Sequence, residues 1–81
     1  MFITIYTRKN SLPCFATQRA LRQQGLAFVT HCVDDEPELE ESLAEQGFTE
    51  FPVVITDNFS WSGFRPDMIN RLRLHSQAAN C

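Results

Sequence analysis

Cysteine is scarce in this sequence. Three cysteines occur among 81 residues, at Cys14, Cys32 and Cys81. An odd number does not form a closed disulfide framework, and a cytosolic chain keeps its thiols reduced. No cysteine pair has zinc-like spacing, and His31 and His75 stand far apart, so the four ligands of a structural zinc site are missing. We therefore expect free thiols, no metal and no other cofactor.

Long apolar runs and an excess of positive charge are also missing. No apolar stretch approaches the roughly 20 residues of a membrane-spanning helix. Residues 1–6 lack the basic start, long apolar core and small-residue cleavage site of a secretory signal. The formal net charge of −3 at pH 7 argues against general nucleic-acid binding. We expect a cytoplasmic protein that binds neither membranes nor nucleic acid.

The composition that is present is that of one small soluble domain. Apolar residues make up 43% of the chain and charged residues 21%, and 81 residues suffice for a single core. Seven of the ten acidic residues lie between Asp34 and Glu45. Such a run is typical of the solvated face of a helix, and a docking surface for a basic partner is the alternative.

The hydrophobic pattern predicts an α/β fold. Alternating β-branched and aromatic residues indicate strands, and apolar residues at three- and four-residue spacing indicate helices. We expect strands over 2–7, 26–33, 52–56 and 59–61, and helices over about 13–24, from about 34 to 46, and from 66. In this β-α-β-α-β-β-α order, the first two strands are parallel and the last two form an antiparallel hairpin. The result is a four-stranded mixed sheet with helices on both faces, a domain over residues 1–75 and a polar tail over 76–81.

The stretch Ser-Leu-Pro-Cys, from Ser11 to Cys14, stands where the first strand leads into the first helix. Free N–H groups at a helix start stabilise a thiolate and lower a cysteine's pKa there from about 8.5. Dithiol reductases place C-x-x-C at this position, so that the first sulfur attacks a disulfide and the second releases the product. Serine is not ionised near neutral pH without a general base. The alternative is an ordinary helix start, with Ser11 as N-cap and Cys14 as a small buried apolar residue.

Two further segments carry site candidates. Pro52 opens a strand. The Phe51–Pro52 bond could be cis, which would turn the flanking backbone groups toward an incoming extended peptide; the alternative is that Pro52 is a plain strand start. The segment WSGFRPDMINRL places Trp61 and Phe64 around Gly63. Exposed rings there would indicate a surface that a partner covers, whereas the alternative is packing in the core. On the first interpretation, Trp61→Ala lowers partner affinity more than fold stability.

Together these segments resemble one known family. The stretches ITIYTR, QGF, PVVI and WSGFRPDMI, with the x-x-C helix start and the X-Pro strand start, are similar to the NrdH-type redoxins. These are small glutaredoxin-like proteins with a thioredoxin fold. The similarity runs from about Ile3 to Leu72, and it implies a monomeric, cytoplasmic dithiol carrier that takes electrons from thioredoxin reductase and delivers them to class Ib ribonucleotide reductase.

The resemblance also implies roles for individual residues. Ser11 occupies the place of the nucleophilic cysteine, and Cys14 that of the resolving cysteine. In the family, the residues that contact a partner surround these two positions. The corresponding residues of this sequence are Leu12, Pro13, Phe51, Pro52, Trp61, Ser62, Gly63 and Phe64. The step Phe64-Arg65-Pro66 is similar to the NrdH type, which uses a protein reductase instead of glutathione.

Serine at position 11 is the departure from the family pattern. With one sulfur, the chain cannot form the intramolecular disulfide that carries two electrons. An engineered replacement, which we favour because every other family element is intact, and a natural loss of the nucleophile both account for it. The functional alternatives are a redox-inactive docking module and a glutathione-dependent glutaredoxin; an iron–sulfur carrier is more distant, because such proteins ligate the cluster through the first cysteine. We expect Cys32 to be packed or half-packed in its strand, and Cys81 to be exposed on the tail.

Overall fold

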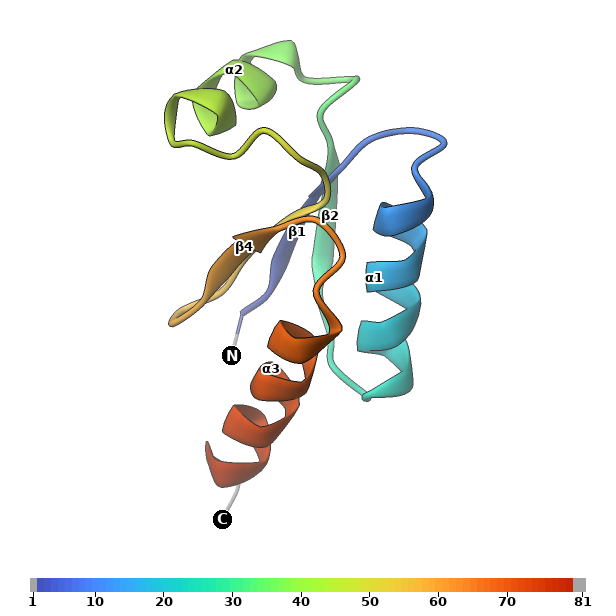
Figure 1. The fold of residues 1–81 in the computed structure, drawn as a ribbon, viewed down its shortest axis with the longest axis vertical. Coiled ribbons are helices and arrows are strands. Elements are labelled where there is room, and N and C mark those ends of the chain that lie inside the picture. The colour runs from blue at the N-terminus through green and yellow to red at the C-terminus, as the bar shows by residue number, and fades with distance from the viewer. Residues whose placement is uncertain (1, 80–81) are drawn as a thin grey trace.

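The computed structural model describes the backbone of residues 2–79 and the side chains of residues 2–74. The elements follow in the predicted β-α-β-α-β-β-α order (Figure 1). They are β1 (Thr4–Thr7), α1 (Leu12–Gln23), β2 (Val29–Cys32), α2 (Pro37–Glu45), β3 (Val53–Ile55), β4 (Ser60–Ser62) and α3 (Pro66–Ala79). Cys81, expected on an exposed tail, lies outside the described residues.

The four strands form one mixed sheet in the order β2-β1-β3-β4. β1 pairs with β2 in parallel and with β3 in antiparallel orientation, and β3 and β4 form the expected hairpin. The register pairs Thr7 with Cys32, Tyr6 with Val53, and Val53 with Ser62. The end of β1, the start of β3 and the end of β4 therefore meet at one edge of the sheet, and the loops that follow or precede them gather there.

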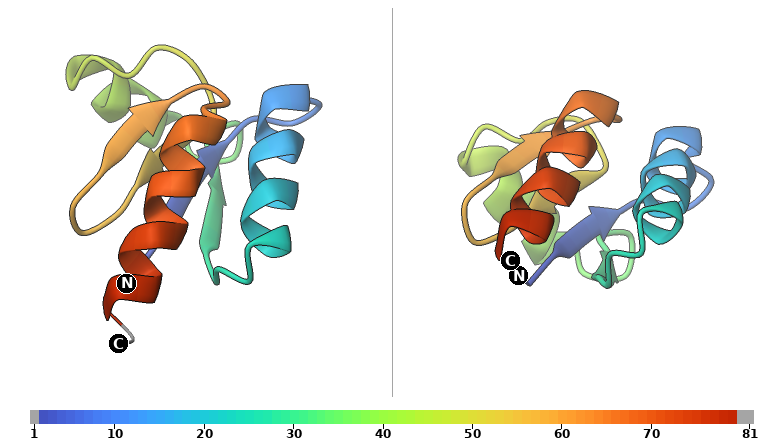
Figure 2. Two further views of the ribbon diagram at one scale, coloured as in Figure 1. Left: turned by 60° about the horizontal axis from the view of Figure 1, so that its bottom comes forward. Right: turned by 90° about the horizontal axis from the view of Figure 1, so that it is seen from below.

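The core lies on both faces of the sheet, as the pattern predicts. Because side chains alternate along a strand, Ile5 and Val54 face α1 and α3, where they pack with Leu21, Ile69 and Leu72. The next residues along the strands, Tyr6 and Val53, pack in the second cluster, which contains Leu43 of α2. Figure 2 shows the same division, with α1 and α3 on one side of the sheet and α2 on the other.

Helix ends follow the sequence signals at the first helix and depart from them at the last. Gly25 has a φ of +73°, and the Leu26 N–H donates to the Leu21 carbonyl at 3.0 Å, which is the predicted left-handed ending. The last helix begins at Pro66 as expected but continues beyond Ser76 to Ala79, since glutamine and alanine at the next positions favour helix. Within the described residues, no helix has the length and apolarity needed to cross a membrane.

Trp61 is buried, which corrects the interpretation of its ring as an exposed partner contact. Only 4% of the residue is exposed, and it packs with Ile3, Val54 and Ile69 in the core beneath α1 and α3. The reason is the register: Trp61 pairs with Val54, whose side chain faces the same cluster. Phe64, three residues on and past the end of β4, is 44% exposed. Trp61 is therefore part of the core, whereas Phe64 contributes to the surface.

Replacing Trp61 by alanine should destabilise the fold. Truncating a buried tryptophan costs about 3–5 kcal/mol because it removes apolar contacts and leaves a cavity. We expect Trp61→Ala to lower the free energy of unfolding in urea by that amount, while Phe64→Ala, at a residue that is 44% exposed, lowers it by no more than about 1.5 kcal/mol. Equal, small effects of the two substitutions would contradict the core assignment of Trp61.

Candidate functional site

The loop between β1 and α1 brings Ser11 to the start of the helix. Asn10 adopts a φ of +56°, a left-handed conformation that asparagine tolerates better than most residues. Ser11 follows in extended conformation, with φ −105° and ψ 115°. Its carbonyl accepts the first helical hydrogen bond, from the Phe15 N–H at 3.2 Å. Ser11 therefore occupies the N-cap position that the sequence predicts.

The expected capping bond of Ser11 is absent: its hydroxyl makes no side-chain cap hydrogen bond. An N-cap side chain normally accepts from the second or third N–H of the helix. The second helical residue here is Pro13, which has no N–H. Half of the usual capping partners are therefore missing, so Ser11 takes the N-cap position without making a capping bond.

Cys14 lies in the first turn of α1 and is only 1% exposed. Thr17, on the same face, is fully buried, and its hydroxyl donates to the Pro13 carbonyl at 2.9 Å. The two residues between Ser11 and Cys14 point outward, and Leu12 is 80% exposed. An incoming disulfide would thus meet Leu12, Pro13 and the Ser11 position before it could reach the sulfur of Cys14.

The segment before β3 lies at the same edge of the sheet. The Phe51–Pro52 peptide bond is cis, and Pro52 is fully buried. The carbonyl of Pro52 accepts a hydrogen bond from the Gly63 N–H at 2.8 Å, so this group is engaged within the chain and is not free for an incoming peptide. Gly63 has a φ of +81°, and a Cβ there would lie 3.3 Å from Glu50 Oε2, which makes glycine the fitting residue.

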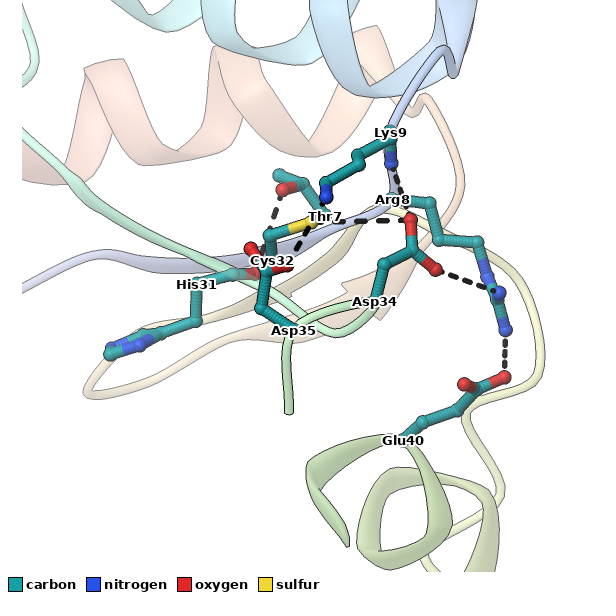
Figure 3. A network of polar contacts seen from close by, with 8 residues as sticks. All are labelled: Thr7, Arg8, Lys9, His31, Cys32, Asp34, Asp35 and Glu40. Atoms are coloured by element: carbon teal, nitrogen blue, oxygen red, sulfur yellow. Dashed lines mark hydrogen bonds and ion pairs between the residues drawn. The ribbon is translucent and has the colours of Figure 1, made fainter. Parts of the chain in front are cut away.

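A polar network joins the loop before Ser11 to the loop after β2 (Figure 3). Asp34 Oδ2 accepts the backbone N–H of Lys9 at 2.8 Å, and Asp34 Oδ1 lies 3.6 Å from the Arg8 guanidinium. The half-exposed Cys32 thiol lies 4.0 Å from Asp34 Oδ2. The Asp35 carboxylate accepts a hydrogen bond from Lys9 Nζ at 3.1 Å and raises the pKa of Lys9.

Arg8 connects this network to two further segments. Its guanidinium pairs with Glu40 of α2 and lies 4.6 Å from the centre of the Phe51 ring. One side chain therefore contacts the β2–α2 loop, α2 and the residue before Pro52. These contacts fix the loop before α1 relative to the Pro52 segment, and they account for part of the acidic run that the sequence assigned to a solvated helix face.

An open groove of about 500 Å³ runs along α1, and Phe64 of the β4–α3 loop lines it as well. Leu12 and Phe64, both predicted from the sequence, line the groove together with Phe15, which is 57% exposed. The remaining lining residues are Ala16, Arg19, Ala20 and Gln23. Phe15 was missed, although an aromatic residue outside the buried 14-17-21 stripe of the helix was a usable signal.

The described site has no exposed thiol at the start of α1. Ser11 stands at the helix start, Cys14 is buried, and Pro52, Ser62 and Gly63 form the neighbouring edge. Among residues 2–74, no three metal-ligating side chains converge. The one cysteine at this place, Cys14, is a free thiol buried beneath the helix start.

Comparison with known proteins identifies the family. A family model for glutaredoxin matches residues 3–61. The glutaredoxin-like protein NrdH of Escherichia coli K12 is 52% identical over 80 residues, which cover 99% of each chain, and that of Lactococcus lactis subsp. cremoris is 34% identical over 86% of this chain and 97% of its own. The solved structure of NrdH-redoxin from Escherichia coli superimposes with a TM-score of 0.86 at 56% identity, over 89% of this chain and 95% of that one. The chain therefore belongs to the glutaredoxin family and, within it, to the NrdH-type glutaredoxin-like proteins.

Proposed function

We propose that this chain is the scaffold of a thiol–disulfide redoxin that carries electrons from thioredoxin reductase to class Ib ribonucleotide reductase in the cytoplasm, and that Ser11 leaves it impaired. The observation that carries the proposal is the position of Ser11 and Cys14 at the start of α1, at the sheet edge shared with Pro52 and Gly63. A monomer is sufficient for this role.

The chemistry follows once a sulfur stands at position 11. In the Ser11→Cys variant, the new thiolate attacks one sulfur of a substrate disulfide, forms a mixed disulfide and expels the other sulfur as a thiolate. Cys14 then loses its proton and attacks the mixed disulfide, which releases the second substrate thiol. The substrate gains two electrons, the variant ends with a disulfide between positions 11 and 14, and a reductase restores the dithiol.

A docking module without electron transfer is the second candidate, and the burial of Cys14 favours it for the chain with serine. At 1% exposure, Cys14 cannot meet a protein disulfide without local opening of the helix start. The exposed surface around Leu12 and Phe64 persists regardless of the residue at position 11. This form could occupy a partner's site without reducing it.

Glutathione-dependent activity is the less favoured alternative. The glutathione carboxylate would need a free charged or polar group after the Gly63 turn. The nearest cation in sequence, Arg65, donates to Asp67 at 2.9 Å, and this hydrogen bond holds the pKa of Asp67 below its usual value. Arg65 is thus already paired, and we propose that glutathione binds weakly.

Ser11→Cys should create disulfide reductase activity. Insulin reduction, driven by NADPH and thioredoxin reductase, should rise well above background with this variant and stay at background with the unchanged chain. The matched control is Ser11→Ala, which alters the same position without adding sulfur. Reductase-dependent activity of the unchanged chain at a comparable rate would refute the role assigned to Ser11, and an inactive, folded Ser11→Cys would refute the redoxin assignment.

Ser11→Cys combined with Cys14→Ser should trap the partner. Without the resolving thiol, the mixed disulfide is released only by an outside thiol, so a covalent complex with oxidised thioredoxin reductase or ribonucleotide reductase should accumulate on non-reducing gels. The control is Cys14→Ser alone, which should trap neither protein. Equal trapping by both would assign the reactive sulfur to Cys32 or Cys81.

Glutathione should support the Ser11→Cys variant poorly. With glutathione and glutathione reductase in place of thioredoxin reductase, we expect a rate at least about tenfold lower, because a carboxylate left unpaired at the site loses one or more charged hydrogen bonds. Equal rates with the two reducing systems would favour the glutathione-dependent alternative.

A further inference from the structure

The groove along α1 is lined by exposed apolar side chains. Leu12, Phe15 and Phe64 are 80%, 57% and 44% exposed, and all three line it. They come from two segments, the start of α1 and the loop before α3, whose helices lie side by side on one face of the sheet (Figure 2). Three large apolar side chains exposed around one hollow on so small a domain indicate a surface that another molecule covers.

One basic side chain lines the groove. Arg19 lines it one turn beyond Phe15, and no carboxylate within residues 2–74 forms a salt bridge with it. The other arginine of α1, Arg22, lies 5.5 Å from the Phe28 ring instead. α1 contains no acidic residue, so Arg19 is available to a negatively charged ligand.

The other charged residues on the α1–α3 side of the sheet are also mostly basic. Of the charged residues in α1, α3 and the residue preceding α3, five are arginines and one is an acid, Asp67, which pairs with Arg65. The acids are concentrated on the other side of the sheet, in α2 and the loop before it. The α1–α3 face is therefore positive although the chain carries a net charge of −3.

We propose that this groove binds a peptide segment of the disulfide-bearing partner in which apolar side chains stand next to carboxylates. The apolar side chains lie between Leu12, Phe15 and Phe64, and a carboxylate pairs with Arg19. The proposal rests on the redoxin function and adds to it a preference for the sequence beside the disulfide: acidic and apolar, not basic or purely polar.

A second copy of this chain fits the groove less well. Its acidic surface, α2, supplies carboxylates, but its two leucines, Leu39 and Leu43, pack in the second core cluster. None of the exposed large apolar side chains within residues 2–74 belongs to α2. Self-association through α2 would satisfy Arg19 and leave the apolar side chains of the groove uncovered.

The proposal can be tested by titrating the ¹⁵N-labelled chain, with serine retained at position 11, with capped hexapeptides. The probe is acetyl-Gly-Asp-Leu-Phe-Glu-Gly-amide. One control peptide replaces its acids by their amides, and the other replaces leucine and phenylalanine by serine. We expect amide shifts to change along α1 and at Phe64 with the probe, and both control peptides to bind at least about threefold more weakly, as loss of an exposed ion pair or of an apolar contact predicts.

Matched variants distinguish binding in the groove from attraction by the overall positive charge of the α1–α3 face. Arg19→Gln should weaken binding of the probe about threefold and leave the amide peptide unchanged, because it removes only the ion pair. Phe15→Ser should weaken both. The controls are Arg71→Gln, which removes an exposed charge of the same sign outside the groove, and Leu74→Ser, which removes an apolar side chain that is 56% exposed and does not line it; both should bind the probe normally.

The binding experiment does not depend on redox chemistry, so its failure is distinct from failure of the redoxin assignment. If Ser11→Cys reduces disulfides but the chain binds none of the peptides, the groove proposal is overturned and the function stands. Equal binding of the three peptides, equal effects of Arg19→Gln and Arg71→Gln, or shifts confined to other surfaces would overturn it as well. Concentration-dependent shifts of α1 without peptide would assign the groove to a second copy.

Discussion

The pairing of β1 with strands on both sides is the constraint on which the site depends. Because β2 runs parallel to it and β3 antiparallel, the end of β1 lies beside the end of β2 and the start of β3. Ser11, Asp34 and Pro52 follow or precede those strand ends by only a few residues. A shift of one residue in the register of β1 against β3 would put Tyr6 and Val53 on opposite faces of the sheet and displace the loops that Arg8 now joins.

Much of the fold was predictable because the signals are local. Strand alternation, the proline starts of α2 and α3 and the left-handed ending at Gly25 depend only on neighbouring residues. The family was predictable because segments distant along the chain matched the same pattern. The place of Cys14 inside the helix stripe was predictable for the same local reason, since Thr17 and Leu21 follow at helical spacing.

The remaining features depend on contacts between distant segments. The burial of Trp61 follows from the pairing of this residue with Val54. The aromatic residues near Trp61 in the sequence do not show which face of the sheet its side chain occupies. The exposed position of Phe15 depends on how α1 packs against the sheet. Arg8 looks like a loop residue in the sequence, yet it contacts Asp34, Glu40 and Phe51, which come from three later segments. Part of the acidic run is thus bound to the loop before Ser11.

The division of charge between the two faces of the sheet makes the molecule an electric dipole. Its positive end is the α1–α3 layer and its negative end is α2 with the loop before it. A partner with an acidic docking region would exert a torque on such a molecule before contact, so that collisions would occur preferentially with the α1–α3 layer turned toward that region. Salt screens this alignment over about 8–10 Å, so the rate of productive encounter depends on ionic strength even though the contact itself is partly apolar.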